Sequence, residues 1–234
     1  MNRTKNNLLK SFLDLLFPPN CFSCRKRIPE GIICEECKND LVWLEDVCNY
    51  CGSILKNGEC KVCSKEDFAF DRARSVYGFN KVMQKFIHDL KYDEMIRIAD
   101  FLGQKAAELL LELKPFSKID IIAPVPLHSV KKRHRGFNQA EMLARKIASE
   151  LKIEHNPNLI IRKRFTQTQT KLGRSERQQN VKGAFELNSK YEIKGKTVLV
   201  VDDVFTTGST LNSISLLLKK HKVSQVFAFT LARA

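Results

Sequence analysis

The sequence predicts an α/β fold, with helices on both faces of a parallel sheet, preceded by a small metal-binding module. From residue 69 onward, short apolar runs alternate with longer segments whose apolar side chains recur at helical spacing. The run 198–201 is wholly apolar, which is typical of a strand buried on both faces. All eight cysteines lie before residue 64, and 234 residues are enough for one medium domain and a small appendage.

The strands and helices expected in the larger domain follow one another along the chain. Apolar side chains at helical spacing predict the longest helix over 95–113. The apolar run 119–125 predicts a buried strand, and 196–202 predicts another. The full predicted order is a strand over 74–79, helices over 82–90 and 95–113, a strand over 119–125, a helix over 138–151, strands over 159–161 and 196–202, a helix over 211–221 and a strand over 223–231.

We expect two domains, residues 1–68 and 69–234, joined by a short linker around 64–68. Near the N-terminus, apolar side chains recur at helical spacing from residue 8 to residue 17, interrupted by Lys10 and Asp14. They predict an amphipathic helix that packs on the body of the protein, with membrane association as the alternative. No apolar run is long enough to span a bilayer and no secretory cleavage site is evident, so a cytoplasmic protein is expected.

The cysteines form four pairs of identical spacing. Two such pairs complete a tetrahedral zinc site, because each pair contributes two thiolates from one tight turn. The sequence therefore predicts two structural zinc ions, and the regular pairing disfavours a disulfide framework. The short gaps favour one zinc for each half of the module, although an interleaved pairing also fits. Metal would replace a core in this segment, either as a docking or nucleic-acid module or as a stabilising cap. The ligands would be Cys21, Cys24, Cys34, Cys37, Cys48, Cys51, Cys60 and Cys63.

A strand, an acid pair and a hydroxyl-rich turn follow one another near the C-terminus. Asp202 and Asp203 come where the strand over 196–202 should end, and small hydroxyl residues around a glycine then precede a helix. A turn of this kind directs backbone N–H groups and the helix dipole at an anion. A ribose 5-phosphate offers diol oxygens for the acids and a phosphate for the turn, which consists of Thr206, Thr207, Gly208, Ser209 and Thr210.

This stretch resembles the phosphoribosyl-pyrophosphate (PRPP) motif of type I phosphoribosyltransferases. Two further blocks, 124–140 with its Arg-Gly-Phe-Asn-Gln sequence and 168–185, follow the paired cysteines and precede the acid pair. With this order the chain resembles the ComF family, competence-associated bacterial proteins with a phosphoribosyltransferase-like domain. The resemblance spans nearly the whole chain and implies a type I phosphoribosyltransferase-like sheet.

The resemblance also implies roles for individual positions. Magnesium-bound PRPP would lie with its diol on the acid pair and its pyrophosphate on the turn after Pro124, formed by Val125, Pro126 and Leu127. Residues 165–181 would be a mobile loop that closes over the ligand; a solvated basic loop is the alternative. Three cations in that loop would neutralise the departing pyrophosphate: Lys171, Arg174 and Arg177. His88 is interpreted as a helix-face residue.

Positive charge is concentrated in one part of the chain. Residues 71–234 hold 30 basic and 16 acidic residues, which accounts for the whole net charge of +14, and 128–182 hold 14 and 4. Such a field suits phosphate-rich partners. Together with this field, the resemblance to the ComF family implies a competence-associated protein that binds PRPP and single-stranded DNA, with a competence helicase or another DNA-uptake protein as partner. The alternative is a salvage-type phosphoribosyltransferase acting on a nucleobase or nucleotide. The DNA contacts would come from Lys131, Lys132, Arg133 and Arg135.

Overall fold

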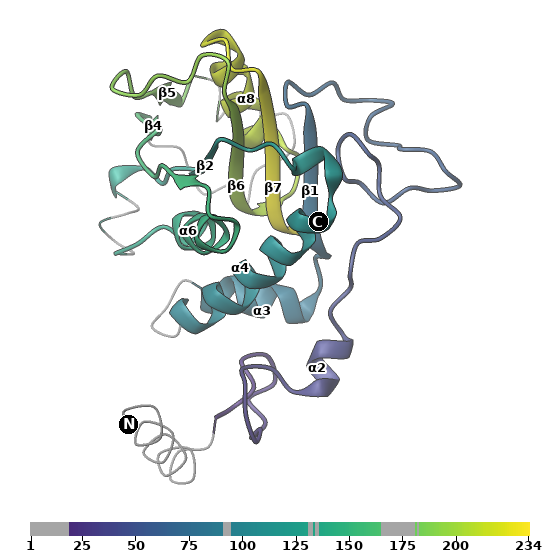
Figure 1. Ribbon diagram of the computed structural model, residues 1–234. Helices are drawn as coiled ribbons and strands as arrows, with labels where there is room; N and C mark the ends of the chain where they lie inside the picture. Colours follow the sequence, from purple (N-terminus) through teal and green to yellow (C-terminus); the bar gives the residue numbers. More distant parts are fainter. Residues whose placement is uncertain (1–18, 91–94, 131–132, 134–135, 165–180, 182) are drawn as a thin grey trace.

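Five parallel strands form the central sheet of the computed structural model, which describes residues 19–90, 95–130, 133, 136–164, 181 and 183–234 (Figure 1). Their spatial order is β1-β7-β6-β2-β3. The strand predicted over 74–79 is confirmed as β1, which lies at one end of this order beside β7, while Trp43 forms an isolated antiparallel bridge with Tyr77 on its other side. The strands are β1 (Arg72–Gly78), β2 (Ile121–Pro124), β3 (Glu154–His155), β6 (Thr197–Phe205) and β7 (Gln225–Arg233).

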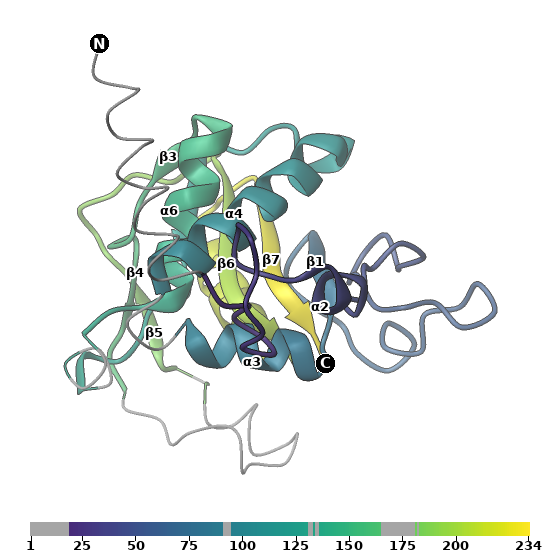
Figure 2. The ribbon, with the colours of Figure 1, turned by 90° about the horizontal axis from the view of Figure 1, so that it is seen from below.

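Helices cover both faces of this sheet, as the alternating apolar pattern predicts. Leu199 and Val201 of β6 join the apolar core beneath three helices, and Val198 and Val200 join the core beneath the fourth. Figure 2 shows the three-helix layer from below. The three are α3 (Lys81–Asp89), α4 (Met95–Glu112) and α6 (Gln139–Leu151), and the fourth is α8 (Ser209–Lys220).

The structure differs from the sequence prediction at several strands, and β3 is one that the sequence does not predict. Residues 159–161 were expected in the parallel sheet, but β4 (Ile160–Arg162) pairs antiparallel with β5 (Phe185–Leu187) in a separate two-stranded sheet. The sequence did not predict β5, because a strand of three residues is too short to show a period. In addition, β6 continues to Phe205, past its predicted end at Asp202, because β7 remains paired with it up to Arg233.

The cysteine-rich segment, residues 19–68, has two parts: the first, with Cys21–Cys37, lies below α3 and α4 in Figure 1, and the second, with Cys48–Cys63, lies beside β1. Its one described helix is short, α2 (Glu35–Asn39). Phe68, expected in a linker, is 7% exposed and stacks on Phe70 with ring centroids 4.7 Å apart. This segment therefore shares its apolar packing with the sheet. The helix predicted over residues 8–17 lies outside the described residues.

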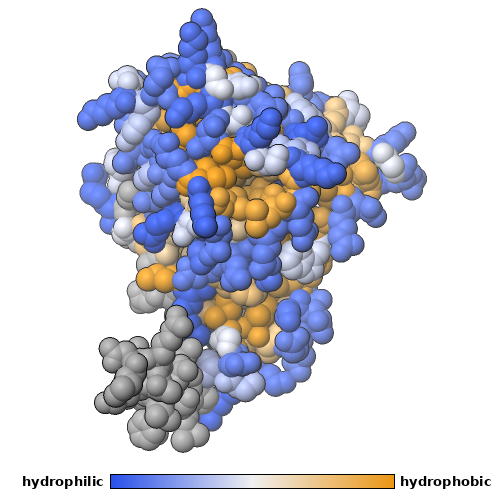
Figure 3. Space-filling view, viewed as in Figure 1, coloured by the Kyte–Doolittle hydropathy of each residue, from blue (hydrophilic) through white to orange (hydrophobic). Residues whose placement is uncertain are grey.

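Hydrophilic side chains dominate the face seen in Figure 3, with apolar side chains exposed near its middle. Among the described residues, no helix combines the length and apolarity needed to cross a bilayer.

Candidate functional site

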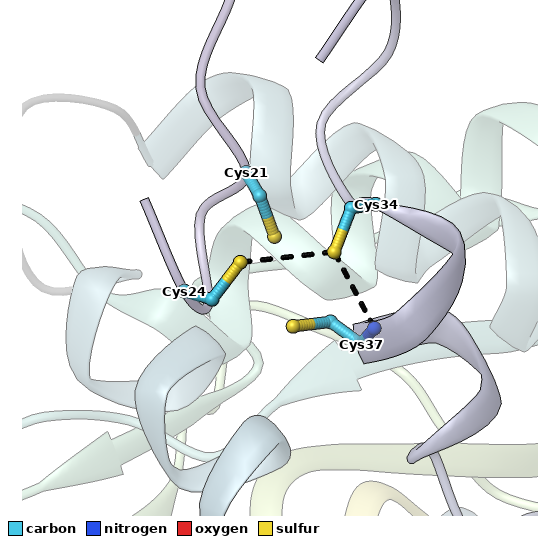
Figure 4. Close-up of side chains that lie close together, drawn as sticks. All are labelled: Cys21, Cys24, Cys34 and Cys37. Atoms are coloured by element: carbon cyan, nitrogen blue, oxygen red, sulfur yellow. Dashed lines mark hydrogen bonds between the residues drawn. The ribbon is translucent and has the colours of Figure 1, made fainter. Parts of the chain in front are cut away.

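The cysteines gather into two clusters of four, each drawn from consecutive pairs. One contains Cys21, Cys24, Cys34 and Cys37 (Figure 4), and the other contains Cys48, Cys51, Cys60 and Cys63. Within each cluster all ligand atoms lie within 4.8 Å of one another. This grouping agrees with the sequential pairing that the short sequence gaps favour.

The spacing of the sulfur atoms fits zinc. Tetrahedral coordination at a Zn–S distance of about 2.3 Å places sulfurs about 3.8 Å apart. The Sγ atoms of Cys24 and Cys34 are 3.7 Å apart, those of Cys48 and Cys63 are 3.7 Å apart, and those of Cys51 and Cys60 are 3.5 Å apart. Sulfurs in a disulfide would be separated by about 2 Å. The two clusters therefore fit two structural zinc ions.

Backbone N–H groups in the tight turns stabilise thiolates. Cys37 N donates to Cys34 Sγ, and Cys63 N donates to Cys60 Sγ, both at 3.4 Å. Burial works to raise the pKa of Cys60, but hydrogen bonds, led by the backbone N–H of Cys63, lower that pKa to about 6. Burial likewise opposes the hydrogen bonds that lower the pKa of Cys21 to about 6. Each cluster thus contains one thiol that readily becomes a thiolate, whereas burial raises the pKa of Cys37 in the first cluster and of Cys63 in the second.

The hydroxyl-rich turn joins β6 to α8 around one glycine. Gly208 is the N-cap of α8 and has φ +74°. An added Cβ would lie 2.5 Å from Cζ of Phe205 and 2.9 Å from Cε1 of Phe68. Beside it, the Oγ atoms of Thr207 and Ser209 are 2.7 Å apart. Because the first N–H groups of a helix have no partner within the helix, the start of α8 is suited to a phosphate.

The acid pair lies within β6, directly before the turn. Asp203 N donates to Asp202 Oδ1 at 2.9 Å, and Val204 N donates to Asp203 Oδ1 at 2.7 Å. Both acids are half-buried. Burial raises the pKa of Asp202 well above its usual value, the charge of Asp203 raises it further, and Arg162 opposes the rise. A cation or a hydroxyl donor beside the pair would favour its ionised form.

A cavity of about 410 Å³ is lined by the acid pair and by all five residues of the turn. Its opposite wall comes from Phe79 and from three side chains of α3, namely Gln84, Ile87 and His88. No motif in the sequence predicts that these residues line a site. The only signal is that residues 84, 87 and 88 share one helix face, which is equally common in helices without a site. The volume is within the range of roughly 300–1,000 Å³ found for small-ligand sites.

The turn after β2 lies next to the end of β6, as expected for neighbouring parallel strands. Val125 N donates to Val201 O at 2.8 Å, and the Asn138 side-chain amide donates to Val125 O at 3.0 Å. Pro126 and Leu127, however, line a second cavity, of about 450 Å³, together with Arg162 and Lys190. The predicted ligand residues are therefore divided between two cavities. Arg162 is the link, because it lines the second cavity and its charge acts on Asp202.

Most of the cations singled out in the sequence lie outside the described residues, namely Lys131, Lys132, Arg135, Lys171, Arg174 and Arg177. Arg133 is described and exposed.

Two family models match the chain, one in each part. A double zinc ribbon domain matches residues 12–67, and a phosphoribosyl transferase domain matches residues 138–234. These matches agree with the cysteine clusters, with the acid pair in β6 and with the turn that follows β6.

Three curated relatives are similar over most of the chain. Competence protein F of Haemophilus influenzae is 32% identical over 222 residues, which cover 92% of this chain and 96% of the relative. DNA utilization protein YhgH of Escherichia coli K12 is 28% identical, covering 94% and 99%. Competence protein ComFC of Bacillus subtilis is 25% identical, covering 88% and 86%. The chain therefore belongs to the ComF family of competence proteins, in which a double zinc ribbon precedes a phosphoribosyltransferase domain.

Proposed function

We propose that this protein binds PRPP together with magnesium and handles incoming single-stranded DNA in the cytoplasm during natural transformation. The observation that supports this most directly is the cavity of about 410 Å³, in which an acid pair faces the same space as a hydroxyl-rich helix start. A ribose 5-phosphate has the matching chemistry, with a diol at one end and a phosphate at the other.

Each part of this ligand would have its own partners. Asp202 and Asp203 would accept hydrogen bonds from the ribose diol, and residues 206–210 would surround the 5-phosphate with N–H and hydroxyl donors. The turn after β2, residues 125–127, would direct its backbone at the pyrophosphate. Magnesium would neutralise part of the negative charge of the pyrophosphate.

The DNA part of the proposal rests on the relatives and on charge. Two relatives bear competence in their names and a third is called a DNA utilization protein. The net charge of +10 over residues 128–182 would suit a phosphate backbone. A competence helicase or another DNA-uptake protein would be the protein partner.

The second candidate function is phosphoribosyl transfer to a base. It is favoured by the cavity wall that Phe79 and α3 form. Phe79 offers an aromatic face, and Gln84 and His88 offer polar groups for the edge of a planar acceptor. In that reaction Lys171, Arg174 and Arg177 would stabilise the leaving pyrophosphate. Pyrophosphate release from PRPP, measured with nucleobases, nucleotides or single-stranded DNA as acceptor, distinguishes the two functions.

Changing both acids to asparagine should abolish most PRPP binding. The Asp202→Asn/Asp203→Asn variant keeps the shape of the pair but removes the charge that favours a magnesium-bound diol, so we expect at least a tenfold loss of affinity. Calorimetry with and without magnesium measures it. The matched control is Asp71→Asn, because Asp71 accepts a hydrogen bond from Val226 N and pairs with Lys219 away from the cavity. Equal affinity in the double variant and the wild type would place the ligand elsewhere.

Single-stranded DNA should bind with a steep dependence on salt. Replacing Lys131, Lys132, Arg133 and Arg135 with alanine should weaken binding and reduce the slope of log K against log salt by up to about three, at about 0.7 per lost phosphate contact. Fluorescence anisotropy at several salt concentrations measures both. The control replaces four exposed lysines of the cysteine-rich segment, Lys38, Lys56, Lys61 and Lys65. A loss of affinity confined to the control would assign DNA binding to the zinc ribbons.

A further inference from the structure

One arginine joins the second cysteine cluster (Cys48, Cys51, Cys60 and Cys63) to β6. This strand leads into the hydroxyl-rich turn, residues 206–210, which is called the phosphate turn below. Arg233, the last residue of β7, donates from Nη1 to the carbonyl oxygen of Cys51 at 2.7 Å. Its Nη2 donates to Ser53 Oγ and lies 4.0 Å from Cys51 Sγ. The guanidinium carbon lies 4.0 Å from the centroid of the Phe205 ring. Arg233 therefore contacts a predicted zinc ligand on one side and the end of β6 on the other.

The ring of Phe205 in turn supports the phosphate turn. Phe205 is 2% exposed, and its Cζ is the nearest atom to the position that a side chain on Gly208 would occupy. Phe68 and Phe70 meet this ring edge-on, with centroids 6.0 and 6.1 Å away. Because Arg233 and the two other rings surround Phe205, a shift of the guanidinium would change the packing beneath Gly208.

Zinc would change the force on Arg233. Four thiolates around one Zn²⁺ carry a net charge of −2, which attracts the guanidinium. The same zinc orders the turn that presents the Cys51 carbonyl. Both effects hold Arg233 over Phe205 only while the second cluster is occupied.

We propose that Arg233 is a positioning residue that couples zinc in the second cluster to the conformation of the phosphate turn. Zinc there raises the affinity for a phosphoribosyl ligand, and the ligand raises the affinity for that zinc by the same factor, since coupling between two binding sites is reciprocal. The proposal rests on the proposed PRPP binding and adds a control of it by the zinc ribbon.

Arg74 offers a matched control. It also holds the second cluster, donating from Nη1 to the Cys48 carbonyl at 2.7 Å and from Nη2 to Asn49 Oδ1 at 3.2 Å. Its guanidinium thus makes the same kind of contact with the same turn of the zinc ribbon. It extends from β1, however, and not from the strand that packs against Phe205.

The test compares the full-length wild type with Arg233→Met and Arg74→Met. PRPP affinity is measured by calorimetry with magnesium, and zinc affinity by equilibrium competition with a chromogenic chelator, with and without PRPP. In the wild type, PRPP should raise the affinity for one of the two zinc ions about tenfold, within the usual range of coupling. Arg233→Met should bind PRPP about tenfold more weakly and lose this effect of PRPP on zinc affinity. Arg74→Met should bind zinc more weakly, yet keep both the PRPP affinity and the effect of PRPP on zinc affinity.

The outcomes separate the two proposals. A wild type that does not bind PRPP overturns the proposed function. PRPP binding that is unchanged in Arg233→Met, or a zinc affinity that PRPP does not change in the wild type, overturns only the coupling. If Arg233→Met is purified without zinc, Arg233→Lys decides, since lysine keeps the charge but cannot both stack on Phe205 and donate to two partners. Full coupling in Arg233→Lys would contradict the role given to the guanidinium.

Discussion

Removing zinc should destabilise the sheet as well as the cysteine-rich segment. Zinc contributes on the order of 10 kcal/mol to the folding of small zinc-binding peptides, so its loss should unfold the segment that it organises. That segment shares both apolar cores with the sheet. Cys21 and Phe22 belong to the core beneath α3, α4 and α6, and Cys51 and Phe68 belong to the core beneath α8. Unfolding the ribbons therefore exposes apolar surface of the larger domain.

We expect chelation to lower the thermal transition of the whole chain by at least about 10 °C, because each kcal/mol is equivalent to about 2–4 °C in a chain of this size. Calorimetry, with circular dichroism as a second probe, measures it. Cys24→Ser and Cys51→Ser should each retain one zinc by elemental analysis. Cys51→Ser should lower the thermal transition more than Cys24→Ser, since Cys51 is fully buried and Cys24 is exposed. A sheet transition that is unchanged by chelation would show that the two parts fold independently.

Gly208→Ala should abolish PRPP binding and destabilise the fold by about 2–5 kcal/mol. About 1–2 kcal/mol is the cost of the left-handed conformation for a residue with a Cβ. A further 1–3 kcal/mol is typical of overpacking, and here the added Cβ would lie 2.5 Å from the ring of Phe205. The ring cannot move away easily, because Arg233 and Phe70 hold it in place. The turn would have to shift instead, which would displace its N–H groups from the phosphate.

Gly195→Ala separates the free-energy cost of the left-handed backbone from the cost of overpacking. Gly195 has φ +75°, but an added Cβ would meet nothing within 4 Å. This control should therefore lose only about 1–2 kcal/mol and keep full PRPP affinity. Thermal denaturation and calorimetry measure both variants. Equal PRPP affinity in Gly208→Ala and Gly195→Ala would show that the turn does not hold the phosphate.

Much of the fold and part of the site follow from local patterns. The four cysteine pairs predict two four-thiolate clusters, because each pair brings its two sulfurs together within a single turn. The order of strands and helices likewise follows from apolar periodicity over stretches of four residues or more. The link from Asp202 to Gly208 was also predictable, since a strand, an acid pair and a helix start are adjacent in the chain.

Contacts between distant segments decided the rest. Gln84 and His88 lie more than 110 positions before the acid pair, and only the packing of α3 beside the ends of β1 and β7 brings them to the same cavity. Contacts between distant segments also pair β4 with β5. They likewise divide the predicted ligand residues between two cavities.

The sequence by itself determined which chemical groups this protein has and which of them are neighbours along the chain. Only the tertiary structure decided that Arg233 bridges Cys51 and Phe205, residues separated by more than 150 positions. The physical reason is that periodicity and motif spacing report interactions within a turn, a strand or a helix. The apposition of two such elements depends on side-chain packing across the whole core.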